Sequence, residues 1–375
     1  MGTDAKKIKP FVLPAAMALW LSFLFLPFKG LKAASLLFLV LVVAVPLIKL
    51  VSGLSKKTRS FIERLAGLVP RDERYAYVLL VPVLVLPFIA EDYVVDVAVI
   101  SGIYIILALG LNVVVGYTGL LNLGFVAYYA IGAYSYALLN TKLGIGFWTA
   151  LPLSVVCTTL AGFVLAVPAL RLKGDYLAIV TLGFGEIVRL VLNNWDNFTK
   201  GPNGISNIAP PSLFDTAIGK ISHYYFLVLF FVILAVFVMR RVQDSKIGRA
   251  WIAIREDGIA SSAMGINTMM YKLYSVAFGA FWAGLAGCLF AAKMRFVSPE
   301  SFTFMESVLI LCMVIIGGIG SIVGVIVGAI VLVFLPEVLR DAQMYRMLAV
   351  GCGLVFLMVF RPQGLFGRKS VSPGG

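Results

Sequence analysis

The segment that decides the fold of this chain reads Asp244-Ser-Lys-Ile-Gly-Arg-Ala-Trp-Ile-Ala-Ile-Arg-Glu-Asp-Gly-Ile-Ala-Ser-Ser-Ala-Met-Gly-Ile-Asn267, and long apolar runs flank it on both sides. From residue 248 to residue 264 its apolar residues can form one face of a helix: Trp251, Ile252, Ile254, Ile259, Ala260, Ala263 and Met264. The charged residues Arg249, Arg255, Glu256 and Asp257 can occupy the other face. This helix is too short and too charged to span a membrane. It either joins two spans as a plain surface helix or docks a cytoplasmic subunit.

The composition indicates a membrane protein. Of 375 residues, 61% are hydrophobic and 13% are charged, and the apolar residues fall in long runs between short polar breaks. A soluble chain of this length needs more polar residues to cover its surface. The sequence therefore predicts an all-α, polytopic membrane protein with about 10–12 transmembrane helices. The cysteines lie singly in apolar runs and His223 is the only histidine, so no disulfide, metal cluster or cofactor is expected.

Three regions are predicted along the chain. Residues 1–74 form an N-terminal extension with two transmembrane helices, 11–28 and 36–50, and a basic cytoplasmic linker, 52–74. Residues 75–361 form the main transmembrane domain around the segment 244–267, and residues 362–375 form a cytoplasmic tail. The expected spans of the main domain are 75–90, 97–115, 120–139, 147–168, 176–192, 224–239, 273–292, 307–335 and 348–360. The run 307–335 is too long for one span and is broken at Gly317-Gly-Ile-Gly320, which predicts a hairpin of two short helices.

Basic residues predict how the chain is oriented. They are about threefold more numerous in the segments assigned to the cytoplasm than in those assigned to the outside. This bias explains the net charge of +13 without a nucleic-acid partner. It places both termini and the segment 244–267 in the cytoplasm. It places the loop 193–222 outside, where that loop either contacts a partner or is simply solvated.

Small residues recur at helical spacing in two stripes. One stripe consists of Gly279, Ala283 and Gly287, and the other of Gly320, Gly324 and Gly328. Such stripes let helix backbones approach closely, where van der Waals contact replaces the hydrophobic drive that lipid does not supply. They are typical of packing inside one polytopic chain, and they also suit a homologous partner subunit.

Polar residues at membrane depth are further candidates for functional sites. Glu186 and Arg189 are three residues apart, so they share a helix face and can pair. Charges at this depth usually face protein, water or a partner. A structural ion pair and a place on a translocation path both remain open for them. Asn112 and Asn122 raise the same question.

Several enzyme motifs are missing from the sequence. It contains no Gly-x-x-x-x-Gly-Lys-Ser/Thr loop for nucleotide phosphates, no Gly-x-Ser-x-Gly nucleophile elbow and no His-Glu-x-x-His zinc motif. The chain is therefore expected to be non-catalytic. If ATP drives its function, the ATPase must be a separate chain.

Five motifs together resemble one family. They are Gly110-Leu-Asn-Val-Val-Val-Gly-Tyr-Thr-Gly-Leu-Leu-Asn-Leu-Gly124, Arg171-Leu-Lys-Gly-Asp-Tyr-Leu-Ala-Ile-Val-Thr-Leu-Gly-Phe-Gly-Glu-Ile-Val-Arg189, Gly201-Pro-Asn-Gly-Ile205, Gly248-Arg-Ala-Trp-Ile-Ala-Ile-Arg-Glu-Asp257 and Arg361-Pro-Gln-Gly-Leu-Phe366. With these motifs the chain resembles, from about residue 97 to residue 366, the LivM-type permeases of bacterial branched-chain amino acid ABC transporters. No single motif is specific to that family, but the set of five is.

The resemblance implies a function and a set of partners. The chain would be a permease that carries leucine, isoleucine and valine across the inner membrane, without a cofactor of its own. It would work in the lipid bilayer with a LivH-like second permease, two LivG/LivF-like cytoplasmic ATPase subunits and a periplasmic binding protein. The alternatives are an ABC permease for amides or urea and a secondary transporter driven by an ion gradient. The segment 244–267 has no evident role in a secondary transporter.

The resemblance also implies that the segment 244–267 is a coupling helix. ABC permeases carry a Glu-Ala-Ala-x-x-x-Gly signature on the helix that docks the ATPase. Aligned on Gly265, this chain matches the signature at Ala260 and departs from it at Ile259 and Ser261. The residues expected to couple the ATPase are Arg249, Ile254, Arg255, Glu256, Asp257, Ala260 and Gly265.

The predicted orientation can be tested by labelling. Cysteines introduced at Ser55 and Ser206, in the linker 52–74 and the loop 193–222, should react with membrane-impermeant reagents from opposite sides of the membrane. Labelling of both positions from the same side would contradict the predicted topology.

Overall fold

The computed structural model describes residues 84–338, apart from 173, 214–215 and 218–219, together with residue 351. These residues belong to one compact unit of the chain, Val81–Gly375. The predicted extension 1–74, the last span 348–360 and the tail 362–375 lie outside the described residues, as does the first part of the span 75–90.

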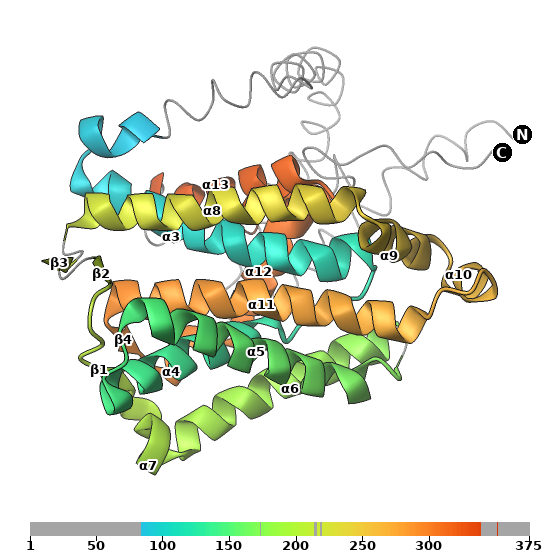
Figure 1. The fold of residues 1–375 in the computed structure, drawn as a ribbon, viewed down its shortest axis with the longest axis horizontal. Helices are drawn as coiled ribbons and strands as arrows, with labels where there is room; N and C mark the ends of the chain where they lie inside the picture. Colours follow the sequence, from blue (N-terminus) through green and yellow to red (C-terminus); the bar gives the residue numbers. More distant parts are fainter. Residues whose placement is uncertain (1–83, 173, 214–215, 218–219, 339–350, 352–375) are drawn as a thin grey trace, which may run out of the picture. The chain divides into compact units, whose positions relative to one another are not determined.

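The described part of the chain is almost entirely helical (Figure 1). Its α-helices are α3 (Asp92–Leu111), α4 (Phe125–Leu143), α5 (Phe147–Ala169), α6 (Asp175–Asn194), α7 (Asp196–Thr199), α8 (Ile221–Asp244), α9 (Lys246–Glu256), α10 (Gly258–Ala263), α11 (Thr268–Met294), α12 (Phe304–Gly317) and α13 (Ile322–Val338). Helix α3 continues into a π-helix, η1 (Asn112–Tyr117). Two 3₁₀ turns, η2 (Gly201–Asn203) and η3 (Pro299–Phe302), and four short strands complete it: β1 (Ile205–Ser206), β2 (Ser212–Leu213), β3 (Thr216–Ala217) and β4 (Phe296–Val297).

The helices confirm an all-α, polytopic membrane protein. Four helices among the described residues are long and apolar enough to cross a membrane: Asp92–Tyr117, Phe147–Ala169, Ile221–Asp244 and Thr268–Met294. Helices α4 and α6 run beside them but are less apolar, and α12 and α13 are shorter apolar helices (Figure 1). The hairpin predicted from the glycines of 317–320 is confirmed, because α12 ends at Gly317 and α13 begins at Ile322.

Helix α11 is the central element of this bundle. It packs against α3, α4 and α5, and Figure 1 shows it between α3 and α8 on one side and α4 and α5 on the other. A Cβ atom at Gly287 would lie 2.7 Å from the backbone nitrogen of Ala133 in α4, and one at Gly279 would lie 3.1 Å from the carbonyl oxygen of Gly110 in α3. The stripe of Gly279, Ala283 and Gly287 therefore serves packing within this chain.

The second glycine stripe holds the α12–α13 hairpin together. A Cβ atom at Gly324 would lie 2.8 Å from the carbonyl carbon of Gly317, and one at Gly328 would lie 2.9 Å from the nitrogen of Gly317. Gly320 belongs to the turn rather than to a helix, and its φ of 85° is one that residues with a Cβ rarely adopt. Both stripes are thus used inside the chain.

The two long polar segments lie at opposite ends of the helices. Figure 1 shows α9 and α10 at one end and β1, β4 and α7 at the other. The loop 193–222 is more than a solvated connection, because β1 pairs antiparallel with β4 through Ile205 and Val297, both of which are buried. At the same end Lys293 Nζ lies 3.0 Å from Asp96 Oδ2. Which end faces the cytoplasm remains a prediction.

The close packing of α4 on α11 predicts a difference between two glycines. A Cβ atom at Gly132 would lie 2.5 Å from the Cα of Gly284, whereas one at Gly183 in α6 meets nothing within 4 Å. Gly132→Ala should destabilise the purified protein by about 1–3 kcal/mol, because two backbones must separate. Gly183→Ala should leave it unchanged or stabilise it by up to about 1 kcal/mol, because alanine favours the helix. Thermal unfolding in detergent measures both variants, and equal midpoints would contradict the packing described.

Candidate functional site

The segment 244–267 consists of two helices rather than one. Helix α9 ends at Glu256, and the extended Asp257 (φ −152°) separates it from α10. The Asp257 carboxylate accepts hydrogen bonds from the backbone nitrogens of Ile259 at 2.8 Å and Ala260 at 2.9 Å. The prediction of one continuous helix from residue 248 to residue 264 is therefore wrong, because Asp257 caps a second helix instead of lying on the polar face of the first. The Asp257-Gly258 pair is the sequence signal that could have revealed this break.

The apolar residues of the segment divide between the two helices. In α9, Trp251 and Ile254 are only 2% and 5% exposed, and Trp251 Nε1 donates to the carbonyl oxygen of Tyr271 at 2.7 Å. Ile259 in α10 and Met264, directly after its end, are 84% and 83% exposed. The expected single apolar face is thus two faces. That of α9 packs against its own chain, and that of α10 is open.

The charged residues of α9 also differ in their surroundings. Arg249 Nη1 donates to the carbonyl oxygen of Asp244 at 3.1 Å, within the same segment, and Glu256 is exposed. Arg255 Nη1 instead donates to the carbonyl oxygen of Gly116 in η1. Of the seven candidate coupling residues, Ile254 is therefore buried, and Arg255 is exposed but bonds to η1. Arg249, Glu256 and Ala260 are exposed.

Gly265 ends α10 in a left-handed conformation that suits glycine. Its φ is 86°, in the left-handed region, and its nitrogen donates to the carbonyl oxygen of Ser262 at 3.0 Å. The nitrogen of Ile266 donates to the carbonyl oxygen of Ser261 at 3.1 Å, which satisfies another carbonyl of the last turn. A cap at each end therefore fixes this short helix.

Asn112 lies at the junction between η1 and the α12–α13 turn. Its side chain is 1% exposed, and its Oδ1 accepts a hydrogen bond from the backbone nitrogen of Gly320 at 2.9 Å. A Cβ atom at Gly116, the residue that Arg255 contacts, would lie 2.8 Å from the same nitrogen. The structure thus brings Asn112 and Arg255 to one place, although they are far apart in the sequence.

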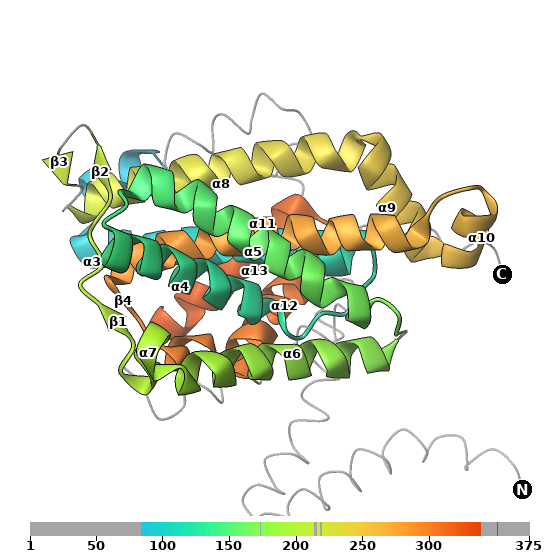
Figure 2. The ribbon, with the colours of Figure 1, turned by 60° about the horizontal axis from the view of Figure 1, so that its bottom comes forward.

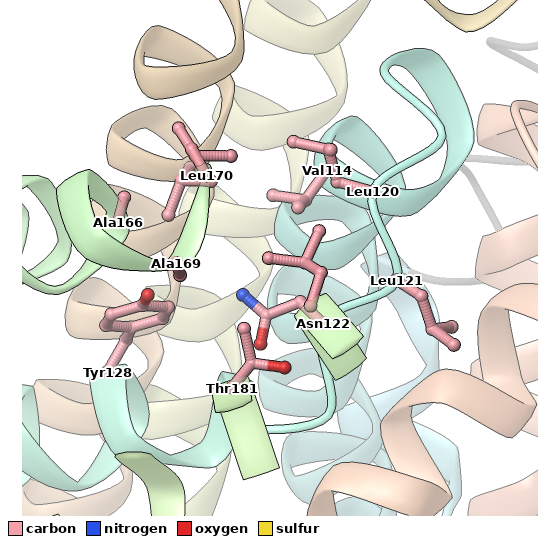
Figure 3. Close-up of a pocket in the computed structure, with 11 residues that line it drawn as sticks. Val114, Leu120, Leu121, Asn122, Tyr128, Ala166, Ala169, Leu170 and Thr181 are labelled. Carbon is pink, nitrogen blue, oxygen red and sulfur yellow. The ribbon is translucent and has the colours of Figure 1, made fainter. Parts of the chain in front are cut away.

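Asn122 lies in a second region, beside a small cavity (Figure 3). The cavity lies between η1, α4, α5, α6 and α11, and its volume of about 10 Å³ admits one water molecule. Figure 3 shows the Asn122 side chain beside Thr181, with its amide group directed toward Tyr128. Asn122 Oδ1 accepts from the nitrogen of Gly124 at 3.0 Å, and Thr181 Oγ1 accepts from the nitrogen of Leu123 at 3.1 Å. The first bond lies within the loop before α4, and the second attaches that loop to α6. Helix α4 begins at Phe125 rather than at residue 120.

Glu186 and Arg189 pair on α6. Arg189 Nε lies 3.0 Å from Glu186 Oε2, and about a third of each side chain is exposed, 32% for Arg189 and 33% for Glu186. The pair is separate from the junction of Asn112 and Arg255. Glu186 directly follows Gly185, and at Gly185 the helix α6 packs against Gly124. Among the described residues, no group of three or more His, Cys, Asp or Glu side chains could hold a metal ion.

Sequence reasoning missed the attachment of α9 to the rest of the chain. Trp251 was assigned to a single apolar face, either of a plain surface helix or of a docking helix, yet its indole Nε1 donates to the carbonyl oxygen of Tyr271 and its ring lies 6.0 Å from that of Phe278 in α11. Gly119, whose Cβ would lie 3.0 Å from Arg255 Cγ, was not singled out at all. Two features of the sequence could have indicated this attachment. One is the large side chain of Trp251, and the other is Gly119 in the turn Tyr117-Thr-Gly119.

A bundle of apolar helices, with the two short helices α9 and α10 at one end, defines a multi-pass membrane protein. A family model described as branched-chain amino acid transport system / permease component matches residues 93–360. The high-affinity branched-chain amino acid transport system permease protein LivM of Escherichia coli (strain K12) is 46% identical over 322 residues, which cover 80% of this chain and 76% of that protein. The LivM of Salmonella typhimurium is equally similar.

More distant relatives include a second kind of permease. The high-affinity branched-chain amino acid transport system permease protein LivH of Escherichia coli (strain K12) is 25% identical over 291 residues, covering 72% of this chain and 92% of that protein. No solved structure matches the chain. The chain belongs to the family of branched-chain amino acid transport system permease components. These relatives do not favour an ion-driven secondary transporter or an amide permease.

The cap at Asp257 can be tested without any partner. Asp257→Ala removes both side-chain bonds to the first turn of α10, which should loosen that helix by about 1 kcal/mol. Amide hydrogen exchange at residues 259–263 should then become roughly fivefold faster, whereas Asp257→Asn should preserve the protection because asparagine caps equally well. Identical exchange in the alanine variant and the parent would mean that the cap does not hold α10.

Proposed function

We propose that this chain is the permease subunit of an ABC importer for branched-chain amino acids in the bacterial inner membrane. The family and the 46% identity to LivM support the substrate class of leucine, isoleucine and valine. ATP would be hydrolysed on separate subunits, since the sequence has no phosphate-binding loop. The chain itself would contribute the path through the membrane and no catalysis.

The observation that carries this proposal is the open face of α10. Ile259 and Met264 are large apolar side chains, more than four-fifths exposed, on a short helix at one end of the molecule. Figure 2 shows α10 beyond the ends of α8 and α11. Burial of each such side chain in a partner's cleft contributes about 1.5–3 kcal/mol. Arg249 and Glu256, exposed on the neighbouring α9, suit the polar rim of the same interface.

The partners follow from this arrangement and from the relatives. Two LivG/LivF-like ATPase subunits would dock at the end formed by α9 and α10, which would then lie in the cytoplasm together with both termini. A periplasmic binding protein would reach the opposite end, formed by β1, β4 and α7. Similarity to both LivM and LivH supports pairing with a LivH-like second permease.

The polar residues at membrane depth divide into two groups in this proposal. The amide oxygens of Asn112 and Asn122 both accept backbone hydrogen bonds, which suits structural roles at two junctions. Glu186 and Arg189 are paired but partly exposed on α6, which suits a position beside the translocation path or a partner.

Substitutions in α10 test the docking role. Ala260→Glu places a charge on the open face, and Gly265→Val places a β-branched residue at a φ of 86°, which distorts the end of the helix. We expect both variants to insert and to fold, but to lose ATPase subunits on purification and to abolish amino acid uptake. Ala260→Ser is the matched control, because it adds no charge and little bulk.

The measurement is the recovery of ATPase subunits with the tagged permease, together with uptake in reconstituted vesicles supplied with binding protein. Wild-type recovery and wild-type uptake in both Ala260→Glu and Gly265→Val would show that α10 only connects α9 to α11.

A further inference from the structure

The side chain of Arg255 lies between two glycine turns of the transmembrane domain. A Cβ atom at Gly119 would lie 3.0 Å from Arg255 Cγ, and one at Gly320 would lie 3.5 Å from Arg255 Nη1. Both glycines have positive φ angles, 70° and 85°. Any larger residue at either position would meet the arginine and would also strain the turn. The glycines therefore leave room for Arg255 where α9 meets the membrane helices.

The guanidinium group holds one end of η1. Arg255 Nη1 donates to the carbonyl oxygen of Gly116, in the last turn of the π-helix. Carbonyl groups in the last turn of a helix lack partners within the helix, so an external donor is needed there. A charged donor makes this bond stronger than a neutral one. This bond therefore connects α9 to η1.

A second hydrogen bond continues the connection. Asn112, at the start of η1, accepts from the nitrogen of Gly320 in the turn between α12 and α13. Asn112 is fully enclosed, so water does not compete for this bond. The bond from Arg255 to Gly116 thus joins α9 to η1. The bond from Gly320 to Asn112 joins the α12–α13 hairpin to η1. All three elements lie at the end of the molecule that carries α10.

We propose that Arg255 is a positioning residue for transport, which links movement of α9 to the π-helix η1 and to the glycine turn between α12 and α13. This inference rests on the proposed function, since it assumes that an ATPase moves α9 and α10. It assigns Arg255 a role different from docking, because its guanidinium bonds to the carbonyl oxygen of Gly116 in this chain, although the residue is exposed. Docking belongs to α10, and transmission of the movement belongs to Arg255.

The test uses the full complex of this chain with its second permease and ATPase subunits, reconstituted with loaded binding protein. Arg255→Ala removes the donor to Gly116 while leaving the face of α10 intact. We expect normal recovery of the ATPase subunits, continued ATP hydrolysis, and at least a tenfold fall in amino acid taken up per ATP hydrolysed. Arg255→Lys should recover part of this ratio, because its ammonium group can also donate to a carbonyl oxygen.

Two further variants make the result specific. Lys246→Ala removes the same charge from an exposed site on the same helix and should keep the parent ratio. Arg255→Gln introduces a side chain that is uncharged and too short to bond to Gly116 equally well, so it should behave like the alanine variant. It provides an independent measurement if Arg255→Ala yields little protein.

Each outcome decides the proposal. An unchanged ratio of uptake to ATP in Arg255→Ala or Arg255→Gln overturns it. Loss of ATPase subunits from these variants also overturns it, because Arg255 would then belong to the docking surface. Failure of the proposed function is recognised separately, by Ala260→Glu complexes that retain their ATPase subunits and take up amino acid normally.

Discussion

The fold depends on direct contact between helix backbones. Lipid tails are as apolar as leucine, so helices in a bilayer associate through close packing rather than through the hydrophobic effect. Here glycine provides that closeness around α11, where Gly132 of α4 touches the backbone of Gly284 and Gly279 touches Gly110 of α3. Glycine also allows α12 and α13 to pack closely in their hairpin, where Gly317 lies against Gly324. Because these contacts are backbone to backbone, they set how closely the helices pack and how they are positioned along one another.

At one end of the helices, α9 is attached to the transmembrane helices and α10 is the proposed docking surface. Helix α9 is attached to the transmembrane helices through Trp251, which bonds to Tyr271, and Arg255, which bonds to Gly116. Helix α10 makes few such contacts and exposes Ile259 and Met264. A partner can therefore bind α10 without competing with the contacts of α9. Helix α10 is joined to α9 at the capped residue Asp257 and to α11 by residues 264–267, so the account has movement of α10 reach the membrane helices through both connections.

Much of the fold could be predicted from the sequence. Runs of apolar residues locate the spans closely, as at α5 and α11, because every helix that crosses a membrane needs such a run. The glycines of 317–320 reveal the hairpin, because few other residues tolerate the positive φ angles of Gly318 and Gly320. The function was predicted from motifs that resemble one family. The chemistry of the residues alone was compatible with several classes of transporter.

The candidate site was predicted less well, for two physical reasons. Helical periodicity cannot distinguish an aspartate on a polar face from one that caps a new helix, and Asp257 does the second. Periodicity is also local, whereas the bond of Arg255 to Gly116 joins residues 139 positions apart. The pairing of β1 with β4 is another long-range contact, so the loop 193–222 could be located but its structure could not be derived.

The central claim is that α10 is the surface that meets the ATPase, and site-specific photo-crosslinking tests it most directly. A photoreactive amino acid in place of Ile259 should form an adduct with an ATPase subunit in membranes that contain the whole complex. The same group in place of Phe198, exposed in α7 at the opposite end, should form no such adduct. Absence of an ATPase adduct from position 259, in a complex that still transports, would contradict the account.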